Sequence, residues 1–266
     1  MRFGCCLNMV STRKDGTGIE RVGRLGEAGY DYVELALAEL MVLSDVERQE
    51  LLDMVKSSGV PCETCNNLFP KTVRLTGPGV ELEKVIAYVE EALALAREIG
   101  AKTVVFGSGP AKNVPEGFPR EEGYQQVVEL LRRMGDVAGR NGITIVIEPL
   151  RKAECNLINT FEEGVRLAKD VAHDSVKVLI DYYHMTVEKE PAGILLQDGE
   201  KYLGHVHFAN PEGRVYPEDM GESDYKSFIE ALRKIGYTGR VSCEAYTQDF
   251  DRHCVTAIDF FRTNFS

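Results

Sequence analysis

Short apolar runs and amphipathic stretches alternate eight times along this chain. We predict strands at 2–7, 31–36, 61–66, 103–107, 143–148, 176–181, 203–208 and 240–245. Helical spacing of apolar residues predicts helices at 18–27, 44–58, 82–99, 123–141, 160–172, 193–202, 224–235 and 247–265. The 266 residues divide into units of about 33, the size of one strand–helix unit of a closed barrel. We therefore predict an α/β fold, a single (β/α)8 TIM barrel domain over residues 1–266, with an open doubly wound sheet as the alternative.

The composition excludes several classes of protein. A formal net charge of −11 argues against nucleic-acid binding, because that binding needs Lys and Arg to neutralise phosphates. No apolar run approaches the roughly 18 residues of a membrane span, so we expect no membrane partner. Residues 1–7 resemble a strand rather than a signal peptide. A hydrophobic content of 44% and a charged content of 27% are typical of a globular enzyme.

The seven cysteines are scattered through the chain, which is typical of reduced thiols. Cys62 and Cys65 have the spacing of a redox or zinc motif, but they fall in a predicted strand. Residues three apart in a strand point to opposite faces. We therefore interpret both as buried core residues, and we predict a cytoplasmic location.

Four successive predicted strands end on a side chain that binds metal ions, namely Glu148, Asp181, His207 and Glu244. The carboxyl ends of barrel strands meet at one rim, where such barrels have their active sites. Burying an ionisable group is costly without a partner, and one divalent cation would serve all four. Three carboxylates and an imidazole suit Mn²⁺, Co²⁺ or Mg²⁺ better than structural zinc. We predict one catalytic cation per chain, with Mn²⁺ preferred.

The five histidines differ in their predicted positions. His205 and His207 lie two apart on one strand and face the same side. His207 is nearer the rim, so we predict it as the ligand and His205 as a hydrogen-bonded interior residue. His184 follows Asp181 by three residues, on the predicted loop that leaves this strand, and is predicted to lie over the pocket. We assign no role to His173 or His253.

Two predicted loops are longer and more polar than a simple connection requires. They cover residues 66–79 and 107–119, and both leave the rim that carries the predicted ligands. We interpret them as walls or lids of a pocket. The segment Gly107-Ser108-Gly109 has the composition of a phosphate-binding loop, but a tight turn is the preferred interpretation.

The motifs of the C-terminal half resemble those of a known superfamily. They are Glu148-Pro-Leu-Arg-Lys-Ala-Glu154, Asp181-Tyr-Tyr-His184, His205-Val-His207 followed by Arg214, and Cys243-Glu244. Together they resemble the sugar phosphate isomerase/epimerase superfamily of xylose isomerase-like barrels, and most closely its ketose 3-epimerase branch. The segment 207–221 departs from that pattern, since its arginine comes one residue later than in the family.

This resemblance implies a metal-dependent sugar isomerase, an epimerase that inverts C3 of a ketose through an enediolate. Glu148 and Glu244 would be both metal ligands and the two opposed acid/base groups. Glu154, His184 and Arg214 would contact the substrate. The family also implies a homo-oligomer, either a dimer or a tetramer.

Other reactions fit the same scaffold. An aldose–ketose or hydroxypyruvate-type isomerase would use one glutamate as a base, and an inosose dehydratase-like lyase would expel water. A three-zinc DNA-repair nuclease needs histidines that strands three and four lack, and a non-catalytic sugar-binding module would have lost the metal or one glutamate. The rim offers only Lys71, Arg74, Lys112 and Arg214 as basic residues. We therefore expect a free ketose rather than a ketose phosphate.

Overall fold

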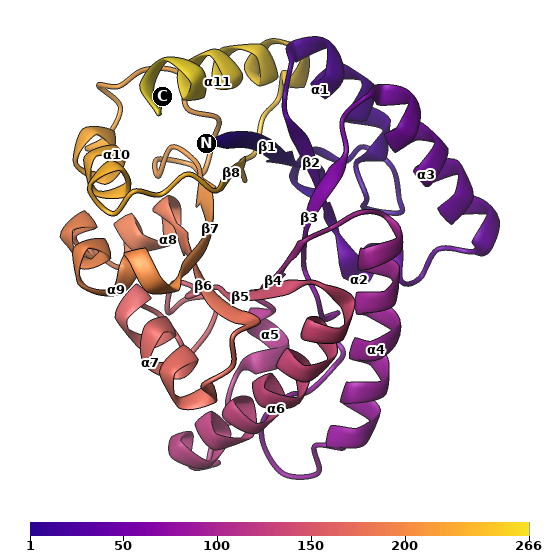
Figure 1. Cartoon of the computed structure of the whole chain (residues 1–266), viewed down its shortest axis with the longest axis vertical. Helices are drawn as coiled ribbons and strands as arrows, with labels where there is room; N and C mark the ends of the chain where they lie inside the picture. Colours follow the sequence, from indigo (N-terminus) through magenta and orange to yellow (C-terminus); the bar gives the residue numbers. More distant parts are fainter. Residues whose placement is uncertain (266) are drawn as a thin grey trace.

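The strands form a closed parallel barrel. The computed structural model describes residues 1–265. The strands are β1 (Arg2–Cys6), β2 (Tyr32–Ala36), β3 (Cys62–Asn66), β4 (Thr103–Phe106), β5 (Thr144–Ile147), β6 (Val176–Asp181), β7 (Leu203–Phe208) and β8 (Arg240–Cys243). They pair in chain order, and β8 closes on β1 (Figure 1). The predicted (β/α)8 barrel is confirmed.

Helices surround the barrel on the outside (Figure 1). They are α1 (Val22–Ala28), α2 (Leu37–Leu40), α3 (Asp45–Ser58), α4 (Leu82–Glu98), α5 (Gly109–Lys112), α6 (Arg120–Asn141), α7 (Phe161–Val171), α8 (Tyr182–Val187), α9 (Leu195–Tyr202), α10 (Tyr225–Lys234) and α11 (Phe250–Asn264). Short 3-10 helices lie at Leu7–Val10, Ile19–Arg21 and Ala192–Ile194. Local signals explain several boundaries; for example, Ser44 and Glu47 form a reciprocal capping box that starts α3.

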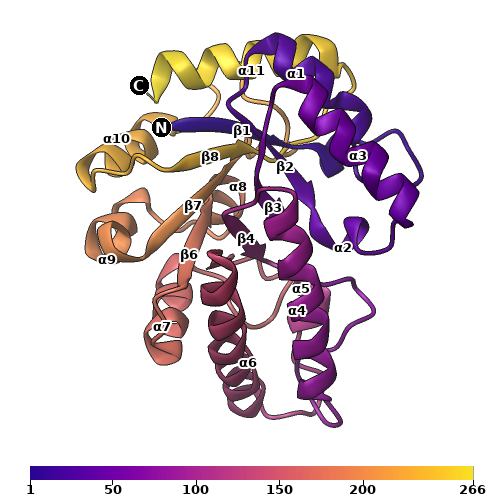
Figure 2. The same cartoon turned by 45° about the vertical axis from the view of Figure 1, so that its right-hand side comes forward.

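Three short helices were not predicted from the sequence. They are α2, α5 and α8, which follow β2, β4 and β6 at the carboxyl ends of these strands. A helical period of apolar residues can be recognised only over a longer stretch than these helices provide, so their sequences were interpreted as loops. Figure 2 shows the long helices α4 and α6 side by side, where they contact each other. Within residues 1–265, the helices are too short or too polar to cross a membrane.

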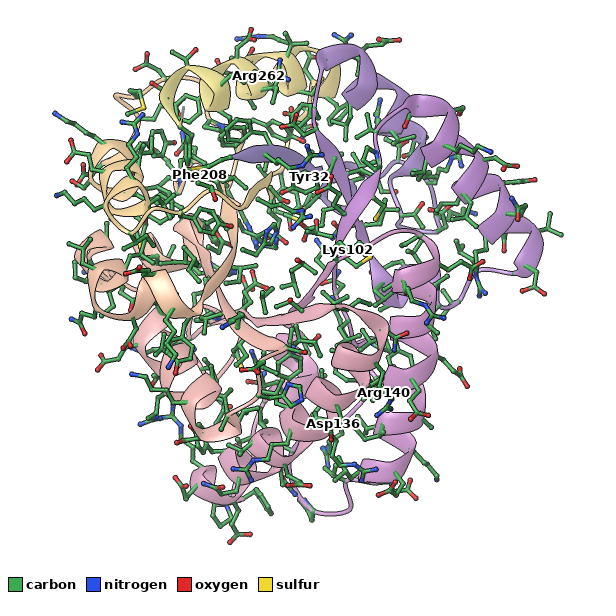
Figure 3. All side chains as sticks on the ribbon, viewed as in Figure 1. Tyr32, Lys102, Asp136, Arg140, Phe208 and Arg262 are labelled. Carbon is green, nitrogen blue, oxygen red and sulfur yellow. The ribbon has the colours of Figure 1, made fainter. Side chains whose placement is uncertain are left out.

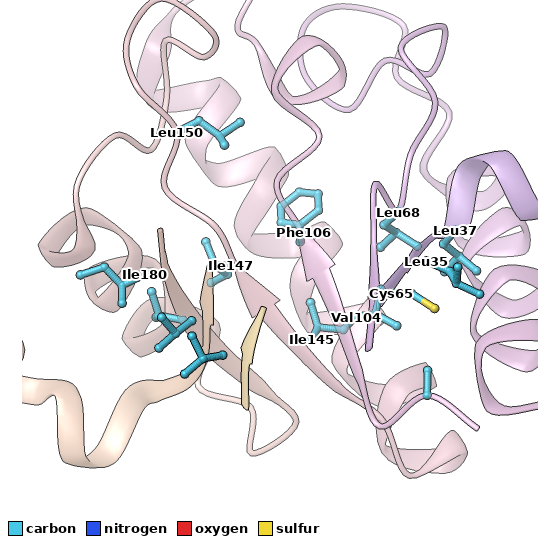
Figure 4. Close-up of a cluster of buried hydrophobic side chains, with 14 of the residues drawn as sticks. Leu35, Leu37, Cys65, Leu68, Val104, Phe106, Ile145, Ile147, Leu150 and Ile180 are labelled. Atoms are coloured by element: carbon cyan, nitrogen blue, oxygen red, sulfur yellow. The ribbon is translucent and has the colours of Figure 1, made fainter. Parts of the chain in front are cut away.

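The strands alternate between an outer face that packs on the helices and an inner face. Leu35, Cys65, Val104 and Ile145 belong to the outer cluster (Figure 4). Inside the barrel, a separate apolar cluster joins Val105, Val146 and Leu179 of β4, β5 and β6. Because alternate residues of a strand share a face, the inner positions at the carboxyl ends converge on one space.

Aromatic packing holds the last two helices against β7. Phe208 lies on the outer face of β7, on the side of α10 and α11 (Figure 3). Its ring centroid is 5.0 Å from that of Tyr225 on α10 and 5.7 Å from that of Phe261 on α11. Such ring pairs add to the free energy of burial, so this cluster stabilises the strand that carries His207.

The predicted geometry of the Cys-x-x-Cys segment was wrong. The register between β2 and β3 shifts by one residue, so that Glu63 is an extra residue in β3. This bulge places Cys62 and Cys65 on the same outer side, where both are buried in the main core. Their interpretation as core residues is confirmed, and all seven cysteines are buried free thiols.

Candidate active site

The four predicted ligands meet inside the carboxyl end of the barrel. Glu148 follows β5, Asp181 ends β6, His207 lies in β7 and Glu244 follows β8. All four side chains are buried, and each offers one ligand atom within 4.8 Å of the others. Nδ1 of His207 is central, at 3.2 Å from Oε1 of Glu148 and 3.1 Å from Oε2 of Glu244.

The buried charges strongly perturb one another. Burial raises the pKa of Glu148, and it raises the pKa of Asp181 to about 6. Burial would also raise the pKa of Glu244, but His207 and Arg214 outweigh it and lower that pKa to about 2. Burial would lower the pKa of His207, but Glu244 and other anionic neighbours raise it well above its usual value. Perturbed groups gathered in a cleft are typical of a functional site.

The donor set fits a divalent cation. Three buried carboxylates face one another, and such a concentration of negative charge needs a positive partner. In this structure Nη2 of Arg214 lies 3.3 Å from Oδ2 of Asp181 and also forms an ion pair with Glu244. Carboxylate oxygens and one imidazole nitrogen are the ligands of hard or borderline cations such as Mn²⁺.

Arg214 reaches the site from an unusual backbone conformation. Its φ is 53°, directly after Gly213 at 82°, so two consecutive residues are left-handed. This conformation is strained for a residue with a side chain, and such strain is concentrated at functional sites. The guanidinium carbon lies 4.8 Å from the centroid of the Tyr183 ring. The displaced arginine of segment 207–221 therefore still lies against the predicted ligands.

His184 lies on α8 rather than on the predicted loop, and it lines the pocket. Its Nδ1 accepts a hydrogen bond of 3.3 Å from the backbone N–H of Arg151, so its hydrogen is on Nε2. Nε2 is buried and has no hydrogen-bond partner among residues 1–265. It lies 3.5 Å from Oδ2 of Asp181 and 3.9 Å from Oε2 of Glu154. Burial lowers the pKa of His184, so this residue is a neutral donor facing the pocket.

Glu154 lies at the edge of the same pocket. Its Oε1 accepts a hydrogen bond of 2.6 Å from Nε of Arg151. About a third of its side chain is exposed, at 32%. The structure therefore brings Glu154 together with His184 and Arg214 on one wall, as the substrate-contact prediction requires.

A cavity of about 880 Å³ opens above these residues. The C-terminal half lines it with Glu148, Glu154, His184, Arg214, Glu244 and Tyr246. The two predicted wall loops line the opposite side, through Asn67, Phe69, Pro70 and Lys71 and through Ser108, Gly109 and Pro110. Their prediction as pocket walls is confirmed. The loops also bond to each other, because the Phe69 N–H donates to Oγ of Ser108 at 3.2 Å.

Two of the predicted basic rim residues do not line the cavity. Lys112 is fully buried, and its Nζ donates a hydrogen bond of 3.1 Å to the backbone carbonyl of Glu148. The ammonium also lies 5.2 Å from the centroid of the Phe106 ring, and burial lowers its pKa. Arg74 is exposed but does not line the cavity. Of the four basic residues predicted at the rim, Lys71 and Arg214 line the cavity.

Sequence reasoning missed Glu34, which lies in the middle of β2. Its carboxylate is fully buried, 2.9 Å from Nε2 of His207 and 2.9 Å from Nε2 of His205. The predicted interior, hydrogen-bonded position of His205 is thereby confirmed. A signal was present, because Tyr32-Val33-Glu34-Leu35-Ala36 is an otherwise apolar run interrupted by one carboxylate.

The architecture has known counterparts. Residues 22–263 match the family described as xylose isomerase-like TIM barrel. D-psicose 3-epimerase of Ruminiclostridium cellulolyticum is 27% identical over 234 residues, which cover 86% of this chain and 78% of that protein. The 3-dehydro-D-guloside 4-epimerase of Escherichia coli K12 is 28% identical over 236 residues, 85% of this chain and 86% of that protein.

A solved structure shares the whole fold. The crystal structure of D-psicose 3-epimerase with D-tagatose from Clostridium cellulolyticum H10 superposes with a TM-score of 0.85 at 23% identity. The match covers 100% of this chain and 100% of that chain. At this identity the superposition shows a common barrel, and the superfamily and branch that the motifs resembled are confirmed by the sequence relatives.

Proposed function

Since this chain belongs to the xylose isomerase-like TIM barrel family, we propose that it is a divalent-metal-dependent epimerase that inverts C3 of a free ketose. It is an enzyme of the carbohydrate epimerase and isomerase class, as its relatives are. The finer assignment rests on the chemistry of the site described above. The same reasoning supports Glu148, Asp181, His207 and Glu244 as the metal ligands.

The observation that carries this proposal is that two glutamates reach one imidazole nitrogen from strands on either side of the strand that carries it. Glu148 and Glu244 come from β5 and β8, which are separated by two strands, and both lie within 3.2 Å of Nδ1 of His207. Inverting a carbon next to a carbonyl requires removal of a proton from one face and its return to the other. Two opposed carboxylates supply a base for one face and an acid for the other.

The surrounding residues orient the substrate between these glutamates. Nε2–H of His184 and the guanidinium of Arg214 are donors that face the cavity, so they would hold the oxygen on which negative charge develops. Glu154, on the same wall, would accept from a substrate hydroxyl. A bound cation, which we expect to be Mn²⁺ with Co²⁺ and Mg²⁺ as substitutes, supplies a Lewis acid that stabilises negative charge on the substrate oxygens.

The charge of the cavity favours a free sugar over a sugar phosphate. Lys71 and Arg214 are its only basic lining residues within the described part of the chain, and Arg214 is already paired with Asp181 and Glu244. A phosphate dianion would need further Lys or Arg partners.

A panel of ketoses and ketose phosphates incubated with Mn²⁺-loaded enzyme in D₂O tests the proposal. NMR reports both the product and the carbon that exchanges its hydrogen. We expect deuterium at C3 and formation of the C3 epimer from a free ketose. Deuterium next to the original carbonyl in an aldose product would instead assign an isomerase. Turnover of phosphates ten times more efficient than that of free sugars would overturn the choice of substrate.

The size of the cavity favours a second candidate, a 4-epimerase of a 3-keto-glycoside. Besides Glu148 and Glu244, the lining of the cavity includes the polar side chains of Asn8, Glu39 and Asn67. Its 880 Å³ lies near the upper end of the range for drug-sized ligands, about 300–1,000 Å³, so a sugar with a substituent fits. One relative is a 3-dehydro-D-guloside 4-epimerase. A kcat/KM for 3-keto-glycosides above that for every free ketose would select this candidate.

We further propose a cytoplasmic enzyme that forms a dimer or tetramer. Seven buried free thiols support a reducing compartment. Light scattering of the purified protein tests the oligomeric state, and a monomer would overturn this part of the proposal.

A further inference from the structure

The carboxylate of Glu34 has hydrogen-bond partners on every side. Oε1 lies 2.9 Å from Nε2 of His207. Oε2 accepts from Oγ1 of Thr64 at 2.7 Å and from Oγ of Ser242 at 2.6 Å, and it lies 2.9 Å from Nε2 of His205. Glu34 and both histidines are completely buried. A buried carboxylate that is bonded in this way has one orientation.

The contact with Glu34 decides which nitrogen of His207 carries hydrogen. A carboxylate oxygen only accepts, so Nε2 of His207 donates. The opposite nitrogen, Nδ1, faces Glu148 and Glu244 at 3.2 and 3.1 Å. A neutral imidazole binds a metal through its unprotonated nitrogen, which is therefore Nδ1.

We propose that Glu34 is the positioning residue of the metal centre. It selects the Nε2–H tautomer of His207 and holds the ring so that the Nδ1 lone pair is directed at the space between the ligand carboxylates. This inference rests on the proposed metal site and adds a residue from β2, on the side of the barrel opposite β6. Partners of this kind change metal affinity by about 10- to 100-fold.

The neighbours of Glu34 are arranged to support this role. Thr64 and Ser242 come from β3 and β8, and the hydroxyl of Tyr32 lies 2.7 Å from Oγ of Ser242. Sγ of Cys6 is 4.0 Å from Nε2 of His207, so Cys6, Glu34 and His207 could also be viewed as a second cation site. The short bond between Nε2 and Glu34 favours positioning, and metal stoichiometry separates the two interpretations.

The decisive variant is Glu34→Gln, with Glu63→Gln as the matched control. Glu63 is also an inward-facing glutamate on a strand, but its partners are Arg2 and Arg240 at the other end of the barrel. Metal-free proteins are titrated with Mn²⁺ by calorimetry. We expect one ion per wild-type chain, a loss of about 10- to 100-fold in affinity for Glu34→Gln, and wild-type affinity for Glu63→Gln.

Two further measurements separate positioning from other roles. Nitrogen-15 NMR of the histidine rings in metal-free protein, recorded above the raised pKa of His207, should show the neutral ring as the Nε2–H tautomer in wild type and as a mixture in Glu34→Gln. At saturating Mn²⁺, kcat of Glu34→Gln should return to within a few-fold of wild type. A kcat that stays low with unchanged Mn²⁺ affinity would overturn the proposal, because Glu34 would then act on the substrate.

The remaining outcomes are equally distinguishable. Two Mn²⁺ ions in wild type and one in Glu34→Gln would show a second cation site and overturn the positioning role. Equal affinity in wild type and Glu34→Gln would also overturn it, whereas absence of binding in wild type would overturn the metal site itself. If Glu34→Gln does not fold, Thr64→Val removes one bond to Oε2 and should lower affinity in the same direction by a smaller factor; unchanged affinity would contradict the proposal.

Discussion

Gly107 lies directly against the carboxylate of Glu148. A Cβ atom at position 107 would overlap Oε2 of Glu148, so the absence of a side chain there makes room for this carboxylate. The pair belongs to neighbouring strand ends, after β4 and at the end of β5. The glycine at position 107 therefore leaves space for the neighbouring carboxylate, and Ser108 and Gly109 lead directly into α5.

We predict that Gly107→Ala displaces the Glu148 carboxylate and lowers kcat/KM by about tenfold or more, since small misplacements of a catalytic group cost up to about 100-fold. Steady-state kinetics at saturating Mn²⁺ measure the effect. Gly193→Ala is the control, because a Cβ there meets no atom within 4 Å. Equal losses in both variants would contradict a specific role for Gly107.

Removal of the divalent cation should abolish turnover. The site consists of three buried carboxylates and one imidazole, and none of these groups is a Lewis acid that could take the place of the cation. EDTA treatment followed by desalting should give inactive protein, and Mn²⁺ or Co²⁺ should restore activity best. Full turnover by metal-free protein would contradict the metal site.

Glu148→Gln and Glu244→Gln should each lower kcat by about 100-fold or more, the usual effect of losing a general acid or base. Glutamine keeps an oxygen that can bind a cation but cannot take up a proton. If both glutamates transfer protons, neither substitution is tolerated. A variant that lacks only the group that returns the proton could still exchange deuterium from D₂O into one substrate epimer. A modest loss of kcat in either variant would favour an isomerase.

Arg214→Lys should lower kcat/KM by about tenfold or more, the effect of losing a charged hydrogen bond of about 1.5–3 kcal/mol. Lysine keeps the charge but lacks the planar guanidinium, whose Nη2 contacts both Asp181 and Glu244 and which lies over the Tyr183 ring. The control is Arg151→Lys, whose side chain pairs with Glu154 at the edge of the cavity. Kinetics that are unchanged in Arg214→Lys would show that only the charge matters.

Glu63 should make stability depend on pH. Burial would raise its pKa, but hydrogen bonds from Arg2 and Arg240 lower it below 4.5. A pKa that is lower in the folded protein than in the unfolded chain adds stability. This stability is fully present above pH 4.5 and is lost as the pH falls through the pKa of the folded protein. Because Arg2 is half exposed, Glu63→Gln should reduce the unfolding free energy by only about 1 kcal/mol at pH 7. Urea titrations at pH 7 and pH 3 should show this difference shrinking at pH 3; a constant difference would contradict the assignment.

Much of the fold, and the convergence of the four predicted ligands, was predictable because the relevant signals are local. The period of apolar residues is read within each strand–helix unit, and the carboxyl ends of parallel strands must share one rim. Once Glu148, Asp181, His207 and Glu244 end successive strands, their convergence follows from this geometry. The burial of His205 followed in the same way, from its position one layer below His207.

Other features depend on contacts between distant segments. Lys112 appears in a polar loop, and only the packing of α5 on Phe106 and Glu148 buries it. The β-bulge at Glu63 reverses the expected faces of β3, because it is set by pairing with β2.

The amino-acid sequence by itself determined the barrel and the residues that end its strands, since hydrophobic period and strand direction are properties of short segments. Only the tertiary structure decided the partners of those residues. Glu34 is separated from His207 by most of the chain, and the two meet only when β8 closes on β1 and brings β2 near β7. Arg214 reaches the site only through two consecutive left-handed residues. Such contacts depend on closure and backbone conformation, which no local pattern of residues encodes.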